Sequence, residues 1–296
     1  MNFYLEIETT QPVEKSHFFR EGFLAGLSYL TRFGHKVAVD VEQLSDQQRA
    51  LLNQEHIDVS EPNNLENTHT ISLDHEANAY LVIDKLNIEA SNWIELANRV
   101  IFPERKVELS RNTSETSIEL SLNLDGKGES DIQTGLHFFD HMLDQIAKHG
   151  LIDLAITCDG DLEVDEHHTI EDVAITLGTA IKQALGDKIG ITRYGFVLPM
   201  DEAQARVALD FSGRPFFKFK GQLEREYVGD FPTEMLEHFF YSLAINVGAT
   251  LHIHIEGDND HHNIEAAFKG FARALREAVK REERTLNILP SSKGIL

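Results

Sequence analysis

The sequence of 296 residues contains a single cysteine, Cys158. One cysteine excludes a disulfide framework and a metal site built from several thiolates, and it favours a reducing compartment. No apolar run approaches the roughly 18 residues that a membrane-spanning helix needs. The first eight residues lack the basic and apolar regions of a secretory signal. We therefore expect a cytoplasmic protein with no membrane partner.

Basic residues are also scarce. The chain has 27 Lys and Arg against 49 Asp and Glu, which gives a formal net charge of -22. Because binding to nucleic-acid phosphates needs clustered Lys and Arg, this balance argues against nucleic acid as a main partner. An acidic surface is compatible with bound divalent cations. Phosphorylated small molecules stay compatible with the sequence, because a few local cations suffice to bind one phosphate.

The sequence does contain a doubled motif. Residues 167–171 read His-His-Thr-Ile-Glu, and residues 261–265 read His-His-Asn-Ile-Glu. Buried imidazoles and carboxylates are costly unless they are paired or bound to metal, so a repeated cluster is hard to explain by packing. On a helix, residues three or four apart are neighbours, whereas adjacent residues point about 100° apart. Each Glu can therefore lie beside one His of its motif, while the two His of a pair are predicted to serve different ions.

An earlier helix in each half adds a matching histidine. Asp140-His141 precedes the first motif as Glu237-His238 precedes the second. We predict two metal sites, each with one histidine from each His-His pair, and the halves of a site can come from different subunits. Imidazole with carboxylate ligands suits Mn, Fe, Co, Ni or Zn, and octahedral sites favour Mn over Zn. The predicted ligands are His141, His167, His168, Glu171, His238, His261, His262 and Glu265. Carboxylates that could orient these imidazoles are Asp140, Asp165, Glu166, Asp172 and Glu237.

A second set of candidates is basic. Arg193 and Arg214 lie in glycine-containing segments, and Lys269 follows Glu265 by one helical turn. The last residues, Pro-Ser-Ser-Lys-Gly-Ile-Leu, contribute Ser291 and Lys293. Taken singly, each cation is better explained as a surface ion pair. Together, in an acidic chain, they are candidates for clamping a phosphate, since Arg can bind it through two parallel hydrogen bonds.

Two regions differ along the chain. Residues 1–103 are expected to form a small α/β domain, with Pro103 as a plausible junction. Residues 104–296 read as two halves, about 104–190 and 191–296, each with strands, a helix, a strand and a helix, which predicts an internally duplicated α+β fold with sheets covered by helices on one face. The expected helices are 18–33, 45–53, 92–100, 135–148, 168–185, 233–246 and 261–280. The expected strands are 36–39, 79–83, 117–124, 151–157, 196–200, 205–210, 216–220 and 250–255.

From about residue 106 to the end, the chain resembles imidazoleglycerol-phosphate dehydratase of histidine biosynthesis. The resemblance is carried by Arg-Asn-Thr-x-Glu-Thr at 111–116, Phe-Phe-Asp-His-Met-Leu at 138–143, the two His-His motifs, Leu-Pro-Met-Asp-Glu at 198–202, Ser-Gly-Arg-Pro at 212–215, Glu-His-Phe-Phe at 237–240 and Pro-Ser-Ser-Lys-Gly at 290–294. It implies a duplicated α+β fold and two Mn²⁺ ions per active site. It also implies a homo-oligomer of 24 subunits with cubic symmetry and active sites at subunit interfaces.

The resemblance further implies a reaction. D-erythro-1-(imidazol-4-yl)glycerol 3-phosphate would lose water and give 3-(imidazol-4-yl)-2-oxopropyl phosphate. Bound metals would act as Lewis acid and template, and a carboxylate would move protons. Glu115 is implied to lie in the substrate site, and the catalytic candidates are Glu115, Glu171 and Glu265. The implied phosphate contacts are Arg193, Arg214, Lys269, Ser291 and Lys293.

The first hundred residues faintly resemble a histidinol-phosphate phosphatase domain of the haloacid-dehalogenase type. They contain no Asp-x-Asp-Gly-Thr nucleophile motif and no cysteine cluster, and Asp84 lacks the neighbouring acids of a Mg²⁺ site. We expect a shortened, non-catalytic remnant. Two alternatives stay open: a bifunctional dehydratase and phosphatase, and a non-enzymatic metal-binding assembly. The second does not explain why Glu115 occurs together with the basic candidates.

Overall fold

The computed structural model describes residues 1–6, 19–20, 22–39, 41–57, 68–74, 80–83, 86 and 88–296. The chain divides into two compact units, Met1–Pro103 and Glu104–Leu296. Within the described ranges, no helix is both long enough and apolar enough to cross a bilayer. The predicted positions Phe18, Ala79, Asp84 and Lys85 lie outside these ranges.

Unit 1 contains a sheet in the order β2-β1-β3-β4-β5. The strands are β1 (Asn2–Leu5), β2 (Lys36–Val39), β3 (Thr68–Asp74), β4 (Tyr80–Ile83) and β5 (Ile88–Ala90). β1 pairs in parallel with β2 and β3, whereas β4 pairs antiparallel with β3 and β5. The helices are α2 (Phe23–Arg32), α3 (Asp46–Gln54) and α4 (Trp93–Ile101), with a 3-10 turn at Val41–Gln43. A parallel strand pair joined through a helix is the α/β arrangement expected from the sequence.

Local chemistry sets the starts of these helices. The helix expected over 18–33 is described from Phe23 onward, after Gly22, which takes a left-handed conformation with φ 75°. α3 begins as predicted. The Ser45 hydroxyl accepts a hydrogen bond from the backbone amide of Gln48, and the Gln48 side-chain oxygen accepts one from the backbone amide of Ser45. Asn92 caps α4 through the amide of Glu95. These caps satisfy amide groups that a helix start leaves without partners.

The two halves of unit 2 have the same topology. The first half has the sheet order β6-β7-β9-β8 and the second half β10-β11-β15-β12. In both sheets the first three strands pair antiparallel and the last pair is parallel. The first half comprises β6 (Lys106–Asn112), β7 (Thr116–Asn123), β8 (Ser130–Gln133), α5 (His137–Gly150), β9 (Asp153–Gly160) and α6 (His167–Leu185). The second comprises β10 (Tyr194–Met200), β11 (Ala203–Asp210), β12 (Phe216–Lys220), β13 (Tyr227–Val228), β14 (Phe231–Pro232), α7 (Met235–Val247), β15 (Thr250–Glu256) and α8 (Asp260–Val279), followed by a 3-10 turn at Glu283–Thr285.

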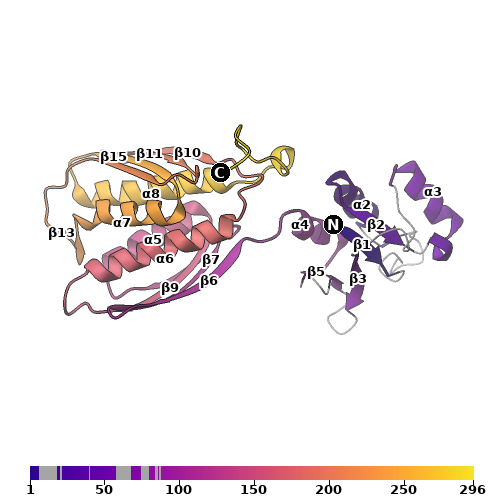
Figure 1. The fold of residues 1–296 in the computed structure, drawn as a ribbon, viewed down its shortest axis with the longest axis horizontal. Helices are drawn as coiled ribbons and strands as arrows, with labels where there is room; N and C mark the ends of the chain where they lie inside the picture. The colour runs from indigo at the N-terminus through magenta and orange to yellow at the C-terminus, as the bar shows by residue number, and fades with distance from the viewer. Residues whose placement is uncertain are drawn as a thin grey trace. The chain divides into compact units, whose positions relative to one another are not determined.

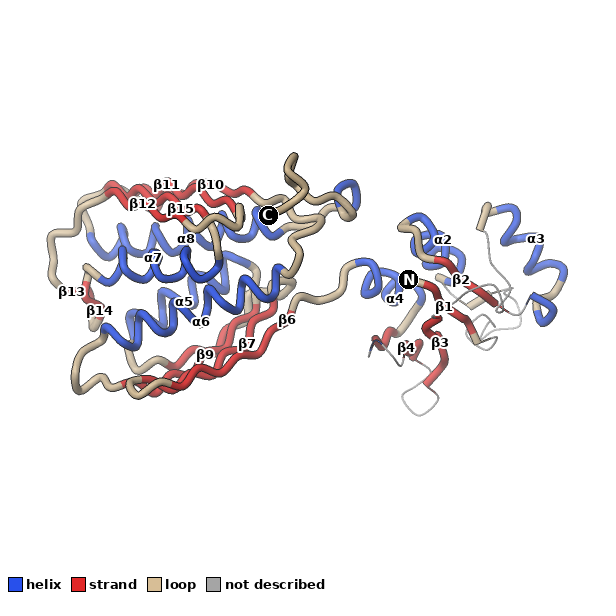
Figure 2. The backbone as a smooth tube through the Cα atoms, viewed as in Figure 1, coloured by secondary structure: helices blue, strands red, loops and turns tan. Residues whose placement is uncertain are grey.

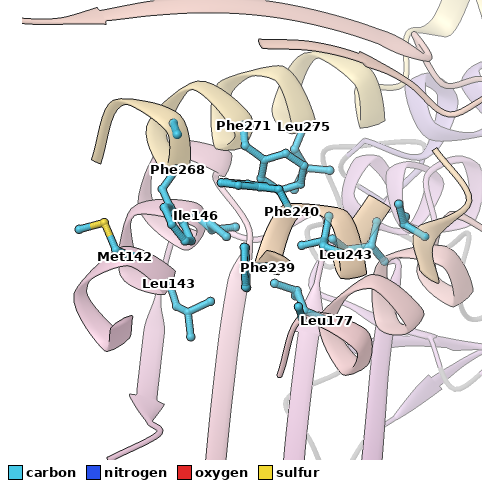
Figure 3. Close-up of a cluster of buried hydrophobic side chains, with 14 of the residues drawn as sticks. Met142, Leu143, Ile146, Leu177, Phe239, Phe240, Leu243, Phe268, Phe271 and Leu275 are labelled. Carbon is cyan, nitrogen blue, oxygen red and sulfur yellow. The ribbon is translucent and has the colours of Figure 1, made fainter. Parts of the chain in front are cut away.

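The four helices of unit 2 lie between the two sheets, so each sheet is covered by helices on one face, as predicted (Figures 1 and 2). The core sits between the helices. Phe239 and Phe240 of α7 point toward Phe268 and Phe271 of α8 (Figure 3), with ring centroids 4.9–5.5 Å apart. These rings are at most 1 % exposed. Burial of such large apolar groups fixes the packing of the helices whose N-terminal ends carry the motifs.

Several strands and one helix end differ from the sequence-based expectation. In unit 1, β1, β3 and β5 were not predicted. In unit 2, β6 and β8 were not predicted, and both are edge strands of the first sheet. α5 includes Gly150 rather than ending before it, and the left-handed residue that closes the helix is Leu151, with φ 51°. β13 and β14 form an additional hairpin in the second half only.

Candidate metal and active site

Three predicted ligands meet between α6 and α7. His167 and Glu171 are one helical turn apart on α6, and His238 lies on α7. The Oε2 of Glu171 is 3.4 Å from the Nε2 of His167 and 3.4 Å from the Nε2 of His238. The two imidazole rings have centroids 4.7 Å apart. All three ligand atoms lie within 4.8 Å of one another.

This group fits a divalent cation. The Nε2 of His238 is buried and has no hydrogen-bond partner, which is costly for a polar atom unless something else binds it. Two atoms that each lie about 2.1 Å from a common ion are roughly 3–3.5 Å apart at tetrahedral or octahedral angles. The two separations of 3.4 Å match that range. Two imidazole nitrogens with a carboxylate oxygen form a donor set suited to Zn or Mn and related transition metals.

The second motif has the same internal geometry. The Nε2 of His261 is 3.4 Å from the Oε2 of Glu265, again across one turn of helix. Lys269 takes the other oxygen of Glu265 at 2.7 Å. His141 on α5 is exposed and lies near Gln145 of its own helix. Among the described residues, His141 does not join His261 and Glu265 within ligand range of one another. Of the eight predicted ligands, one chain therefore brings three together as a group and two as a pair.

The second histidine of each motif turns away from the first. The rings of His167 and His168 are 6.2 Å apart at 74°, and those of His261 and His262 are 5.8 Å apart at 89°. This divergence follows from their adjacency on a helix. Within a single chain, the described residues join His167 with His238 and do not bring together one histidine from each His-His pair. The predicted sites with halves from different subunits stay a prediction.

His168 and His262 each contact a carboxylate through Nδ1. The Nδ1 of His168 is 3.1 Å from both oxygens of Asp161, and the Nδ1 of His262 is 3.0 and 2.9 Å from the oxygens of Glu202. The hydrogen bond to Asp161 raises the pKa of His168. The hydrogen bond to Glu202 raises the pKa of His262, and it lowers the pKa of Glu202. Sequence reasoning missed both carboxylates.

Three of the five carboxylates expected to orient the imidazoles bind other groups. Asp172 binds the Arg111 guanidinium at 2.8 Å and the Thr116 hydroxyl at 2.6 Å. Asp140 accepts hydrogen bonds from the amide and hydroxyl of Thr134. Asp165 accepts from the backbone amide of His167 at 2.9 Å and so caps the start of α6. For Glu166 and Glu237, the described part of the chain gives no contact with an imidazole.

Glu115 lies in the turn between β6 and β7 and is exposed. Its Oε1 is 3.8 Å from the Nε2 of His168. The amide of Asp161 donates to the carbonyl of Glu115 at 3.0 Å, which ties this turn to the loop after β9. Glu115 is thus beside the first motif and open to a ligand, but it does not contact the group formed by His167, Glu171 and His238.

The basic candidates fall into two places. Arg193 has φ 75°, and its guanidinium donates to Asp210 and to the carbonyl of Pro290, the latter at 2.8 Å. These contacts hold the final segment, with Ser291 and Lys293, beside the start of β10. The Ser291 hydroxyl donates to the carbonyl of Ile295 at 2.7 Å. A Cβ at Gly213 would lie 2.6 Å from the carbonyl carbon of Leu296, so Gly213, the residue before Arg214, lies against this segment. Lys269 lies elsewhere, on α8 beside Glu265 and Met200.

Comparison with known proteins gives a consistent result. The family model described as imidazoleglycerol-phosphate dehydratase matches residues 134–275. The chain is similar to the histidine biosynthesis bifunctional protein HisB of Spirosoma linguale, with 54 % identity over 209 residues that cover 71 % of this chain and 55 % of that protein. HisB of Actinobacillus pleuropneumoniae is 58 % identical over 194 residues, which cover 66 % of this chain and 53 % of that protein. The chain thus spans about half the length of the curated relatives it matches.

Two solved structures are also similar. The imidazoleglycerol-phosphate dehydratase of Staphylococcus aureus N315 is 38 % identical, with a TM-score of 0.55, and the match covers 60 % of this chain and 99 % of that one. The Pyrococcus furiosus enzyme, solved in complex with (S)-C348, is 36 % identical with a TM-score of 0.55. That match covers 64 % of this chain and 100 % of the Pyrococcus chain.

Proposed function

The chain belongs to the imidazoleglycerol-phosphate dehydratase family, and we propose that it dehydrates D-erythro-1-(imidazol-4-yl)glycerol 3-phosphate to 3-(imidazol-4-yl)-2-oxopropyl phosphate in the cytoplasm, as a step of histidine biosynthesis. We propose Mn²⁺ as its metal, with two ions per active site. The observation that carries the proposal is the convergence of His167, Glu171 and His238 at 3.4 Å separations around a buried imidazole nitrogen without a hydrogen-bond partner.

The reaction defines what the side chains must do. Water is lost when the hydroxyl on the carbon next to the imidazole departs and a proton leaves the neighbouring carbon. The enol that forms then takes up a proton on the carbon next to the ring and becomes the ketone. A bound divalent cation supplies Lewis acidity and a template for the substrate. A carboxylate must remove and return protons within hydrogen-bond reach of these carbons.

We assign the proton-transfer role to Glu115. It is exposed, so a substrate can reach it, and it lies beside His168. Within the described part of the chain, no Lys or Arg forms an ion pair with it. Glu171 faces two imidazoles and is better suited to hold the cation. Glu265 is paired with Lys269 and His261, which likewise favours a ligand role. Of the three catalytic candidates, Glu115 is thus assigned as the base, and Glu171 and Glu265 are assigned as metal ligands.

We propose that Arg193, Arg214, Ser291 and Lys293 bind the phosphate. The contact of Arg193 with the Pro290 carbonyl supports this, because it brings the final segment to the start of β10. Lys269 is proposed to contact the same phosphate in an assembled oligomer. The pair formed by His261 and Glu265 is completed in the same way, by His141 or by histidines of a second subunit. The incomplete pair supports contact between subunits, and the number of 24 subunits is what the family resemblance implies.

A metal-binding assembly without catalysis is the competing function. It accounts for the His and Glu clusters. It gives no reason for an exposed Glu115 beside the first motif or for a basic segment around Arg193. We also propose that unit 1 is a non-catalytic remnant of a phosphatase domain. The missing Asp-x-Asp-Gly-Thr motif supports this, so purified protein is expected not to hydrolyse histidinol phosphate.

Turnover of the imidazole substrate tests the proposal. The protein is stripped of metal with a chelator, and product formation is followed before and after Mn²⁺ is added. We expect activity only with Mn²⁺. Glu115→Gln should lose at least about 100-fold in kcat, the scale of general acid–base catalysis, while still binding Mn²⁺. The control is Glu119→Gln, an exposed residue of β7. Tight Mn²⁺ binding without turnover by the unaltered protein would favour the metal-binding assembly.

A further inference from the structure

Two carboxylates outside the proposed ligand set hold the two outward histidines in the same way. Asp161 meets the Nδ1 of His168 at 3.1 Å through both oxygens, and Glu202 meets the Nδ1 of His262 at 3.0 and 2.9 Å. The side chains are 21–39 % exposed, so these contacts lie near the surface without being fully solvated. Neither carboxylate comes from a motif that sequence analysis singled out as orienting.

We propose that Asp161 and Glu202 are positioning residues that fix His168 and His262 with the proton on Nδ1 and so present each Nε2 to a divalent cation. The proposal rests on the proposed dehydratase function, because that function is the reason to expect a divalent cation at these histidines. An ionised carboxylate can accept hydrogen bonds but cannot donate, so the nitrogen it faces must carry the proton. In a neutral imidazole the other nitrogen then has the free lone pair that a metal needs.

The two carboxylates come from different places in the duplicated fold. Glu202 lies in the hairpin between β10 and β11, the first hairpin of the second half. The corresponding hairpin of the first half, between β6 and β7, carries Glu115. Glu115 faces the opposite nitrogen of His168, at 3.8 Å from Nε2. In that half the Nδ1 contact is made by Asp161, which follows β9.

This difference has a chemical consequence. If Glu115 had to hold Nδ1 as Glu202 does, its carboxylate would be occupied by a hydrogen bond. With Asp161 in that role, Glu115 is left on the side of the ring where the cation and substrate would bind. The two halves have thus diverged so that one hairpin acid positions a ligand while the other is free for proton transfer.

Asp201, Glu202 and His262 also lie within ligand range of one another. In our proposal these three residues do not form a separate cation site, because the Nδ1 of His262 donates its proton to Glu202 and has no lone pair for a metal. Counting Mn²⁺ per chain tests this point. The positioning role predicts that replacing Glu202 weakens Mn²⁺ binding at the site that includes His262. The number of Mn²⁺ ions bound per chain should stay the same, because Glu202 itself binds none.

The experiment uses the full chain in metal-free form, titrated with Mn²⁺ while free Mn²⁺ is measured by electron paramagnetic resonance. Asp161→Asn and Glu202→Gln should weaken Mn²⁺ binding by about 10–100-fold, the usual cost of losing such a partner. Asp161→Glu and Glu202→Asp keep the charge and should recover part of the affinity. The controls are Glu163→Gln and Asp258→Asn, exposed acids close to each pair in the sequence. Circular dichroism confirms that each variant is folded.

The outcomes separate this inference from the proposed function. Wild-type affinity in folded Asp161→Asn and Glu202→Gln would overturn the positioning role even if the unaltered protein dehydrates its substrate. Weakened binding that the charge-preserving variants restore would support it, whether or not turnover is detected. In an active enzyme, the lost kcat of both amide variants should return at high Mn²⁺, which a defect in the fold would not show.

Discussion

At the scale of single residues, the site depends on which atom of each imidazole faces which oxygen. His167 and His238 turn their Nε2 atoms to one oxygen of Glu171, whereas His168 and His262 turn Nδ1 to Asp161 and Glu202. The first arrangement leaves a buried nitrogen without a hydrogen bond, and the second satisfies one nitrogen of each ring. The inner cluster is therefore suited to take up a cation, and the outer histidines are oriented before one binds.

Replacing Glu171 tests the inner cluster. Glu171→Gln removes the anionic oxygen that both imidazoles face, so Mn²⁺ affinity should fall by more than the roughly 10–100-fold that loss of an outer partner costs. Calorimetric titration of metal-free protein measures this. Glu119→Gln, on the exposed face of β7, should bind as the unaltered protein does. Equal affinity of the two variants would remove Glu171 from the ligand set.

Cys158 provides a second residue-scale prediction. Burial raises the pKa of its thiol to about 11, and the side chain is 8 % exposed on the inner face of β9. Because the thiolate is the reactive form, the folded protein should react with Ellman's reagent very slowly at pH 8. One thiol per chain should react at once in denaturant. Rapid reaction of the folded protein at pH 8 would contradict the placement of β9.

At the scale of secondary-structure elements, the sequence predicted the helices and most strands of unit 2, but not its edge strands β6 and β8, nor β1, β3 and β5 of unit 1. β7 and β11 alternate buried and exposed side chains because each has a strand on both sides and helices on one face. β6 and β8 were missed because neither has a fully buried residue: β6 alternates only between exposed and half-buried side chains, and β8 has a single half-buried one, so the contrast along each strand is weak. Asp161 and Glu202 were missed for a related reason. Their contacts with histidine depend on how a loop and a hairpin lie against helix ends, which spacing along the chain does not encode.

The packing of α6 against α7 can be tested at Gly178. A Cβ there would lie 2.7 Å from the Leu243 carbonyl oxygen and 3.1 Å from the Asn246 Cβ. On an isolated helix, Gly→Ala would stabilise by about 1 kcal/mol. Here the contact should reverse the sign, so Gly178→Ala should destabilise unit 2 by roughly 1–3 kcal/mol. Urea unfolding followed by circular dichroism measures this, with exposed Lys182→Ala as the control. A stabilised Gly178→Ala would mean that the helices are not this close.

An ion-pair cluster joins the start and end of unit 2. Asp125 lies 2.7 Å from Arg105 and 3.0 Å from Arg281, and Arg105 also donates to the Val279 carbonyl. The arginine side chains are only 11 and 12 % exposed. Asp125→Asn would leave both cations without their carboxylate, so it should destabilise unit 2 by roughly 2–3 kcal/mol. Glu119→Gln is again the control in urea unfolding.

The pH dependence of this effect has a definite sign. Burial alone would raise the pKa of Asp125, but the hydrogen bonds and charges of Arg105 and Arg281 outweigh it and lower that pKa below 3.8. A carboxylate with a lowered pKa contributes stability that is complete above its unfolded pKa and is lost as pH falls through the folded value. The difference between the unaltered protein and Asp125→Asn should therefore be constant near neutral pH and shrink below about pH 4. A difference that grows in acid would contradict this.

At the scale of the whole molecule, the chain consists of two units with separate cores. Trp93 is the only tryptophan and is fully buried in unit 1, so its fluorescence reports the unfolding of that unit. All proposed metal ligands belong to unit 2. Mn²⁺ at about 100 times its dissociation constant should stabilise unit 2 by about 2.7 kcal/mol.

A melting experiment with two probes uses this separation. Mn²⁺ should raise the midpoint temperature of the unfolding transition seen by far-ultraviolet circular dichroism, a signal to which unit 2 contributes most. The midpoint temperature seen by Trp93 fluorescence should stay unchanged. The metal-free protein treated with Mg²⁺ is the control for nonspecific effects of a dication on an acidic chain. A Mn²⁺-dependent shift of the Trp93 transition would show that unit 1 takes part in binding.

The most direct measurement for the central claim is an anomalous difference map from crystals grown with Mn²⁺, with X-ray data collected on both sides of the Mn absorption edge. We predict a peak within about 2.0–2.3 Å of Glu171 Oε2 and of the Nε2 atoms of His167 and His238. A second peak should lie beside Glu265 and His261. A map with no Mn peak at Glu171, or with the ion bound only by surface carboxylates, would contradict the metal site on which the proposed dehydratase activity depends.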